Sequence, residues 1–336
     1  MSYKIKTLIV FDTNSLRSTD AGEVAYSFFA FGRPFQVIEI FIIEKNLAED
    51  VHIAIPTWAI EELKDQKKRQ YKTDIAEFQK LAKRLSGLPH IPEITLPEEE
   101  FDCVTYVGEK AVAYLATKQI KLLEIKEEIA NAVLRSMMTR VMKDEGKKKP
   151  FAHSGKYYKD AGFKDNIIWE SLMNFDGLAE FDKVIFLTKD GDYANCDVEF
   201  KTKWNKHLLI TSDENLVLVD IQKDYDNYIK ERIIHDFTQT EYFVDYLRDD
   251  LKVKTVIVIE GVEYKIENFA IADSCKYVDR QPPNEDEVEN LLVSSVISIH
   301  FTQDGKKKVQ PVEALTLLED DETKTIISTE YDIELK

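Results

Sequence analysis

The sequence has few cysteines and no apolar run long enough to span a membrane. Its three cysteines, Cys103, Cys196 and Cys275, lie far apart and form no pair motif. A disulfide framework or a zinc site would need closer pairs with cysteine or histidine partners. The longest apolar candidate, around Gln36 to Ile43, is interrupted by Glu39 and is far shorter than the ~20 residues of a bilayer span. We therefore expect reduced cysteines and a soluble, cytoplasmic protein.

Net positive charge is missing as well. The chain has 45 lysines and arginines against 62 acids, which gives a net charge of −17. This argues against a protein that coats nucleic acid by bulk attraction, because phosphate contacts need a positive surface. It still allows a nuclease whose positive charge is local and assisted by bound cations. P-loop, GxGxxG and GxSxG motifs are also absent, so the sequence gives no support to the chemistries that these motifs carry.

Apolar residues are present in the amount and pattern of a folded α/β protein. They make up 44% of 336 residues, enough for one large or two modest domains. Thr7 to Phe11, Val51 to Ile55 and Val184 to Thr188 are short and nearly continuous apolar runs, typical of strands buried on both faces. A helix is predicted at Pro34 to Asn46, between the first two runs. Such alternation predicts a parallel sheet with crossover helices.

Helical periodicity dominates the middle of the chain. The segments Gly108 to Leu123 and Glu124 to Lys143 are predicted to be long amphipathic helices. Beyond the third apolar run, Leu216 to Ile221 (LVLVDI) is predicted to be a further strand, followed by a helix.

The composition shifts to β-type runs after about Thr240. Asp304-Gly305 lies between two of these runs and is a strong hairpin signal. We therefore predict two domains. The first is an α/β domain at 1–238, with a helical insertion at about 75–160, and the second is a small β-rich accessory domain at 239–336.

Acidic residues directly follow two of the predicted strands. Asp12 ends the first, within FDTN, and Asp190 and Asp192 follow another, within FLTKDGDY. In an open parallel sheet, ligands bind at the carboxyl ends of the strands. A single Asp at such a place is usually a turn residue or a helix cap, so the case depends on the whole set of acids.

Two predicted helix starts add further acids. Asp165 opens the helix DNIIWESLMNF, and Glu61 or Glu62 lies in the first turn of the helix after the second strand. Each has a simple structural alternative, as a helix cap or as a charge near the helix dipole. Several carboxylates brought together repel one another and usually need a divalent cation to coexist. All-oxygen ligation favours Mg²⁺ or Mn²⁺ over zinc.

The four acidic segments DTN, IPTWAIEELK, FKDNIIWESL and FLTKDGDY resemble the motifs of PIN-domain nucleases. The resemblance covers roughly residues 5–225 and implies a Rossmann-like α/β/α sandwich with a parallel sheet. It also implies a Mg²⁺- or Mn²⁺-dependent endonuclease, with RNA as the default substrate and single-stranded or structured DNA as the alternative. One departure is that about 100 residues separate the second acid from the third.

The resemblance also implies roles for individual residues. The catalytic acids it implies are Asp12, Glu62 with Glu61 as its rival, Asp165, Asp190 and the auxiliary Asp192. The metal is expected on Asp12, Asp165, Asp190 and Asp192, where it would lower the pKa of a bound water and stabilise the charge on phosphorus. Asn14 and Thr188 are expected to hydrogen-bond ligands or the scissile phosphate.

A lysine-rich segment before Asp165 is a candidate substrate surface. Residues 147–164 carry six lysines against one Asp, interleaved with aromatic residues. Lysines neutralise phosphates, and aromatic rings stack on unpaired bases. The substrate-binding residues predicted here are Lys156, Tyr157, Lys159 and Lys164. A solvated surface loop is the alternative, and a second basic stretch, Lys64 to Lys72, is more simply the solvent face of a helix.

Two functions from different classes remain at this point. The first is a metal-dependent nuclease, and the second is a catalytically silent PIN-fold scaffold that binds nucleic acid or protein. The gathered carboxylates favour the nuclease, because a module without metal has no reason to collect repelling charges. Nucleic acid is the expected partner and a membrane is not. A homo-oligomer or a protein partner at the insertion or the C-terminal domain is left open.

Overall fold

The computed structural model describes residues 4–18, 26–89, 101–143, 162–193, 196–281, 290–319 and 324–336, apart from the side chains at positions 140–143, 192 and 272–281. The chain divides into two compact units. One comprises Ile5–Ile221, and the other comprises Met1–Lys4 with Gln222–Lys336. Among the described residues, no helix has the length and apolar character needed to cross a membrane.

The first unit is built on a five-stranded sheet with the order β3-β2-β1-β4-β5, in which every pair is parallel. Its strands are β1 (Thr7–Phe11), β2 (Val51–Pro56), β3 (Ile120–Leu123), β4 (Lys183–Leu187) and β5 (His207–Thr211). The chain adds β2 and β3 on one side of β1, and then returns to place β4 and β5 on the other side. The strand order therefore reverses between β1 and β4, and such a switch point is where α/β sheets bind ligands.

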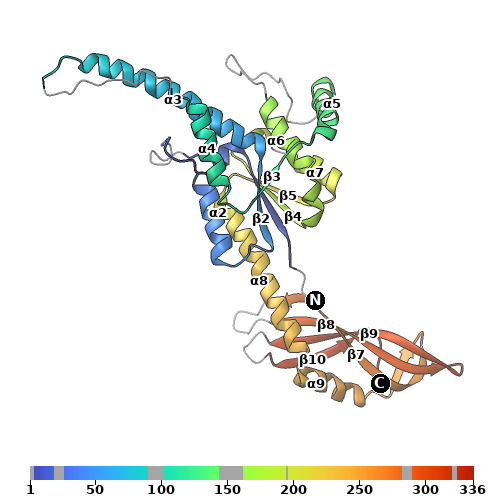
Figure 1. Ribbon diagram of the computed structural model, residues 1–336. Coiled ribbons are helices and arrows are strands. Elements are labelled where there is room, and N and C mark those ends of the chain that lie inside the picture. The colour runs from blue at the N-terminus through green and yellow to red at the C-terminus, as the bar shows by residue number, and fades with distance from the viewer. Residues whose placement is uncertain are drawn as a thin grey trace. The chain divides into compact units, whose positions relative to one another are not determined.

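Helices cover both faces of this sheet. They are α1 (Thr13–Leu16), α2 (Arg33–Glu44), α3 (Thr57–Leu85), α4 (Cys103–Leu115), α5 (Glu127–Lys143), α6 (Phe163–Met173) and α7 (Cys196–Trp204), with the 3-10 turns η1 (Asp176–Glu180) and η2 (Gly191–Tyr193). Figure 1 shows α2 and α4 on one side of the sheet and α6 and α7 on the other. The predicted Rossmann-like α/β/α sandwich is confirmed.

The central strands form because their apolar runs can be buried on both faces. All five residues of β1 are buried, and four of the five in β4. The largest core side chains come from helices, from β4 and from the loop before α2. Those that are fully buried include Trp169, Phe31, Phe35, Phe186 and Phe200. This packing fixes β1 and β4 side by side in register, with Phe11 opposite Leu187.

Two predictions of secondary structure are wrong. Leu216 to Ile221, predicted as a strand, lies in α8 (Glu214–Thr238), the helix that contains the boundary between the two units. The predicted helix at Gly108 to Leu123 ends earlier, because Ile120–Leu123 is β3 and pairs with β2. The segment predicted as a helical insertion therefore contributes one of the two edge strands of the main sheet.

The second unit contains an antiparallel sheet with the order β10-β9-β8-β7-β6. Its elements are α9 (Glu241–Lys252), β6 (Val256–Ile259), β7 (Val262–Gln281), β8 (Asn290–Gln303), β9 (Lys306–Glu319) and β10 (Ile326–Tyr331). Phe243, Leu247 and Leu251 of α9 are buried in its two apolar clusters. Asp304 and Gly305 both have positive φ between β8 and β9, as the predicted hairpin turn requires. The β-rich character of this part is confirmed.

Candidate metal centre

The candidate site lies at the carboxyl ends of β1 and β4, at the switch point of the sheet. The register of the two strands ends with Phe11 beside Leu187, and the Asp12 amide continues it by donating to the Leu187 carbonyl at 3.0 Å. The next residue of each chain segment is polar, Asp12 after β1 and Thr188 after β4. Parallel pairing therefore places these two side chains at one edge of the sheet.

The Asp12 carboxylate is held by a hydroxyl from the neighbouring strand. Its Oδ2 accepts from Thr188 Oγ1 at 2.9 Å, and Thr188 Oγ1 in turn accepts from the Asp190 amide at 3.0 Å. Asp12 is only 2% exposed, and it stands at the N-cap of α1 without a side-chain capping hydrogen bond. The carboxylate is therefore directed toward β4 and does not serve as a helix cap.

Glu62, and not Glu61, is connected to this edge. Thr13 Oγ1, from the residue after Asp12, donates to Glu62 Oε2 at 2.9 Å. The Glu62 side chain is 18% exposed, whereas Glu61 is 56% exposed and pairs with Lys64 at 2.5 Å. The second turn of α3 thus directs one acid toward β1 and the other toward solvent. Thr13 is a contact residue that sequence reasoning did not single out, although its place beside Asp12 was a signal.

Lys164 also reaches Glu62. Its Nζ lies 3.6 Å from Glu62 Oε1, and both side chains are largely shielded from solvent. α6 begins after Gly162, whose positive φ of 74° suits glycine. Lys164 and Asp165 therefore lie in the first turn of the helix, and Asp165 is not its N-cap. The structure brings Lys164 to the acids, so a positive charge stands at this edge among the described residues.

A buried tyrosine connects the third and fourth acidic segments. Tyr193 is fully buried, packs edge-on against Phe186 at 4.8 Å between ring centroids, and donates through Oη to the Asp165 carbonyl at 3.1 Å. Burial raises the pKa of Tyr193 well above its ordinary value, and the negative charges of Asp12, Asp165 and Asp190 raise it further. Sequence reasoning missed this residue, because its burial depends on the tertiary fold.

The contacts form one connected series across four elements. Asp190 and Thr188 follow β4, Asp12 and Thr13 follow β1, Glu62 lies in α3, and Lys164 and Asp165 lie in α6. The negative charges of Asp12, Asp165 and Asp190 add to the effect of burial in raising the pKa of Tyr193. Carboxylate and hydroxyl oxygens are the donors that Mg²⁺ and Mn²⁺ prefer, so the chemistry of these side chains suits such an ion.

The side chains are not arranged as a closed ligand shell. In the part of the chain that the structure describes, no three Asp, Glu, His or Cys side chains come close enough together to hold one ion. The Asp192 side chain and three predicted substrate residues, Lys156, Tyr157 and Lys159, lie outside the described residues. Asn14 is exposed in α1, and its contact with substrate stays a prediction.

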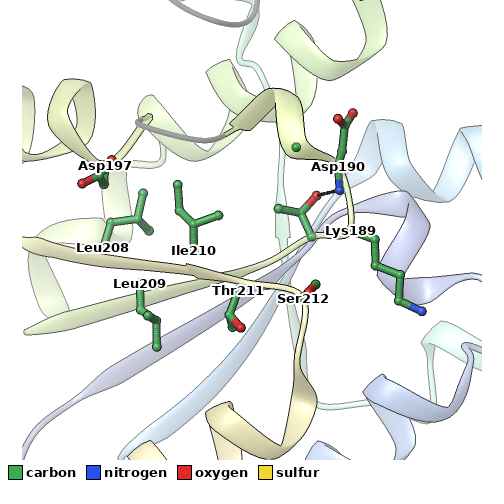
Figure 2. A pocket seen from close by; sticks show the side chains of 10 residues that line it. Lys189, Asp190, Asp197, Leu208, Leu209, Ile210, Thr211 and Ser212 are labelled. Atoms are coloured by element: carbon green, nitrogen blue, oxygen red, sulfur yellow. Dashed lines mark hydrogen bonds between the residues drawn. The ribbon is translucent and has the colours of Figure 1, made fainter.

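A pocket of about 470 Å³ opens beside this edge. The loop after β4 lines it with Thr188, Lys189 and Asp190, and β5 with Leu208 to Thr211, followed by Ser212. In Figure 2, the Asp190 carboxylate points away from the β5 side chains, and a dashed line joins its amide to the Thr188 hydroxyl. The pocket combines apolar walls with a few polar groups, as ligand sites do.

Comparison with known protein families agrees with this geometry. The chain matches the family described as "PIN domain" over residues 9–193, more than half of its length. The matched segment includes Asp12, Glu62, Asp165 and Asp190. Searches of curated proteins and of solved structures found no significant match. The chain belongs to the PIN domain family.

Proposed function

We propose that the edge formed by β1 and β4 is the centre of a metal-dependent endonuclease that hydrolyses phosphodiester bonds, with RNA as its default substrate. The family is generally one of metal-dependent nucleases. The observation that carries the proposal is the Thr188 hydroxyl, which contacts both the Asp12 carboxylate and the Asp190 amide. This hydroxyl connects the Asp12 carboxylate, at the end of β1, to the backbone of Asp190 in the loop after β4.

Asp12, Asp165 and Asp190 are the residues that would hold the ion, with Asp192 as an auxiliary ligand. A bound Mg²⁺ or Mn²⁺ lowers the pKa of a water and stabilises negative charge on the phosphoryl group. Asp12 is nearly inaccessible to solvent, where an ionised carboxylate needs compensation by hydrogen bonds or by a cation. The Thr188 hydroxyl supplies part of this compensation.

Glu62 and Lys164 have complementary tasks in this proposal. Thr13 orients Glu62, so that the free lone pairs of its carboxylate can accept a proton from the attacking water. Lys164, 3.6 Å from Glu62, would contact a non-bridging phosphate oxygen. Water attacks phosphorus, the bond to the 3′ oxygen breaks, and the 3′ oxygen takes a proton from solvent. The products carry a 5′ phosphate and a 3′ hydroxyl.

A cleavage screen tests this function. Single- and double-stranded RNA and DNA would each be incubated with the full chain and either Mg²⁺, Mn²⁺ or EDTA. We expect cleavage of single-stranded RNA that needs the ion and leaves 5′-phosphate ends. Cleavage that persists in EDTA, or products with 3′ phosphates, would contradict the proposed chemistry.

One observation favours a second candidate function, a silent PIN-fold scaffold that binds nucleic acid or protein. Within the described residues, the acidic side chains do not form a preassembled ion site. Thermal unfolding with increasing Mn²⁺ separates the two functions, because an ion that binds the folded state raises Tm. The nuclease predicts a rise in Tm that Asp12→Asn removes. No rise, together with no cleavage in the screen, would favour the scaffold.

A further inference from the structure

The helix α3 carries a local positive charge that contrasts with the rest of the chain. Its 29 residues contain eight lysines and arginines against five acids, whereas the whole chain has a net charge of −17. The helix begins at the candidate site, with Glu62 in its second turn. Only Ala59, Ile60 and Leu63 are buried, and Figure 1 shows α3 continuing past the sheet with α4 beside it.

Aromatic rings from three segments meet beside this helix. Tyr71 of α3 packs against Tyr26 and Phe101, each with 5.5 Å between ring centroids, and Phe101 packs against Tyr106 of α4 at 5.3 Å. Phe101 remains 44% exposed and Phe28 39% exposed. Partly exposed rings of this kind offer faces on which a planar ligand can stack.

Cations lie over these rings. The Lys67 ammonium is 5.9 Å from the centroid of Phe28 and 6.0 Å from that of Tyr26, and the Lys110 ammonium is 5.1 Å from that of Tyr106. Burial lowers the pKa of Lys67, so an approaching phosphate would restore favourable charge interactions to this ammonium. Alternating cations and aromatic rings suit an anionic backbone that carries flat bases.

The acids next to the rings are already engaged. Asp74 accepts hydrogen bonds from Tyr26 Oη and Gln70, both at 2.6 Å. Asp102 caps α4 by accepting from the amides of Val104 and Thr105. These two carboxylates are therefore engaged by hydrogen bonds within the protein, while Lys67 and Lys110 lie over the faces of Phe28 and Tyr106.

We propose that this surface binds single-stranded nucleic acid and leads it to the metal centre. The surface, called here the α3 platform, consists of Phe28, Lys67, Lys68, Lys72 and Phe101. The rings would stack on unpaired bases, while the lysines contact phosphates. This inference rests on the proposed nuclease function for its purpose, but the binding itself needs neither metal nor cleavage.

Binding of a fluorescein-labelled 15-nucleotide oligouridine, in EDTA to prevent cleavage, tests the rings. The full chain carrying Phe28→Leu and Phe101→Leu keeps apolar bulk but loses two stacking faces. We expect its Kd to rise at least about fivefold, the lower end of the loss for one stacked base. Phe78→Leu is the matched control, because Phe78 is an equally exposed ring of α3 (40%) outside the platform. Unchanged binding in the double variant, or equal weakening in the control, would overturn the proposal.

Salt dependence tests the lysines, and it stays informative if the ring variant folds poorly. Lys68→Gln with Lys72→Gln should lower the slope of log Kd against log salt by roughly 0.7 for each lysine. Lys306→Gln with Lys307→Gln removes the same charge from exposed positions of β9 and should leave the slope unchanged. Equal slopes for the two pairs would contradict a local platform.

The same assays keep the two proposals apart. Asp12→Asn should abolish cleavage and leave the Kd for the oligouridine unchanged, because the platform does not include the acids. A wild-type protein that binds through the platform but cleaves nothing would overturn only the nuclease. A protein that cleaves, but whose binding ignores the platform variants, would overturn only the platform. Oligothymidine of equal length tests whether the platform distinguishes DNA from RNA.

Discussion

The two sheets of this protein have the same number of strands but distribute their polar residues differently. In the parallel sheet, β1 and β4 are buried almost throughout, and polar side chains collect where the strands end. In the antiparallel sheet, buried and exposed positions alternate along β9, so that Glu313 stands within the strand and accepts from Ser294 across the ladder. A sheet that is buried on both faces leaves polar side chains only at the ends of its strands. A sheet that is buried on one face carries polar side chains all along its exposed face.

Core substitutions of equal size should show whether the two sheets behave as separate folding units. Ile9 of β1 and Ile297 of β8 are both fully buried. Ile9→Ala should lower the free energy of unfolding of the first unit by about 2–5 kcal/mol. Hydrogen exchange should speed up in β1 to β5 much more than in β6 to β10, and Ile297→Ala should give the reverse pattern. If either substitution accelerated hydrogen exchange equally in both sheets, the two sheets would not be separate folding units.

Two buried threonines, one directly after β4 and one within β9, allow an effect on activity to be distinguished from an effect on stability. Thr188 bonds the Asp12 carboxylate, and Thr316 of β9 bonds Thr329 at 2.9 Å. Thr188→Val should lower kcat/KM roughly tenfold to hundredfold, because a hydrogen bond to a charged group contributes about 1.5–3 kcal/mol. Thr316→Val should reduce stability and leave cleavage unchanged. Equal losses of activity would contradict a specific role for Thr188.

The two adjacent glutamates of α3 offer the next comparison. Glu62→Gln should lower kcat/KM about tenfold, because the amide cannot accept a proton from the attacking water. Glu61→Gln removes only an exposed pair with Lys64, which contributes little, and should stay within about twofold of wild type. A larger loss from Glu61→Gln than from Glu62→Gln would reverse the assignment.

Substitution of the buried Tyr193 should give the smallest effect. Tyr193→Phe removes the hydrogen bond to the Asp165 carbonyl and should cost about 1 kcal/mol of stability. Because the pKa of Tyr193 is raised in the folded protein, its contribution is complete below about pH 10 and is lost as pH rises above that value. Tyr193→Phe should therefore reduce the loss of stability at high pH. An unchanged pH profile of unfolding would contradict the buried neutral phenol.

Much of the first unit could be predicted from the sequence, because its signals are local. β1 and β4 are apolar runs that end in acids, and this pattern alone predicts both a buried parallel strand and the edge where ligands bind. The choice between Glu61 and Glu62 could not be predicted. It depends on which side of the second turn of α3 faces Thr13, and only the packed helix determines that.

The two wrong predictions of secondary structure also arise where local sequence does not determine the structure. The run LVLVDI fits a buried strand or a helix segment equally well, and length and flanking signals must decide. Here Asp213 accepts from the Asn215 amide at 2.9 Å, a helix-start signal that outweighs the β-branched valines. β3 has only four residues and forms an edge strand by pairing with β2, so its identity comes from a partner about 65 residues away in the chain.

Metal-dependent cleavage by Asp12→Asn and Asp165→Asn variants tests the central claim most directly. Each change keeps the size of the side chain and removes one negative charge from the edge of the parallel sheet. With single-stranded RNA and Mg²⁺, and with circular dichroism to verify folding, we predict that each variant loses at least about a hundredfold in kcat/KM, equivalent to about 2.7 kcal/mol. Glu313→Gln, in the antiparallel sheet, should cleave like the wild type. If both aspartate variants kept full Mg²⁺-dependent cleavage, the acids at this edge would not be the catalytic centre.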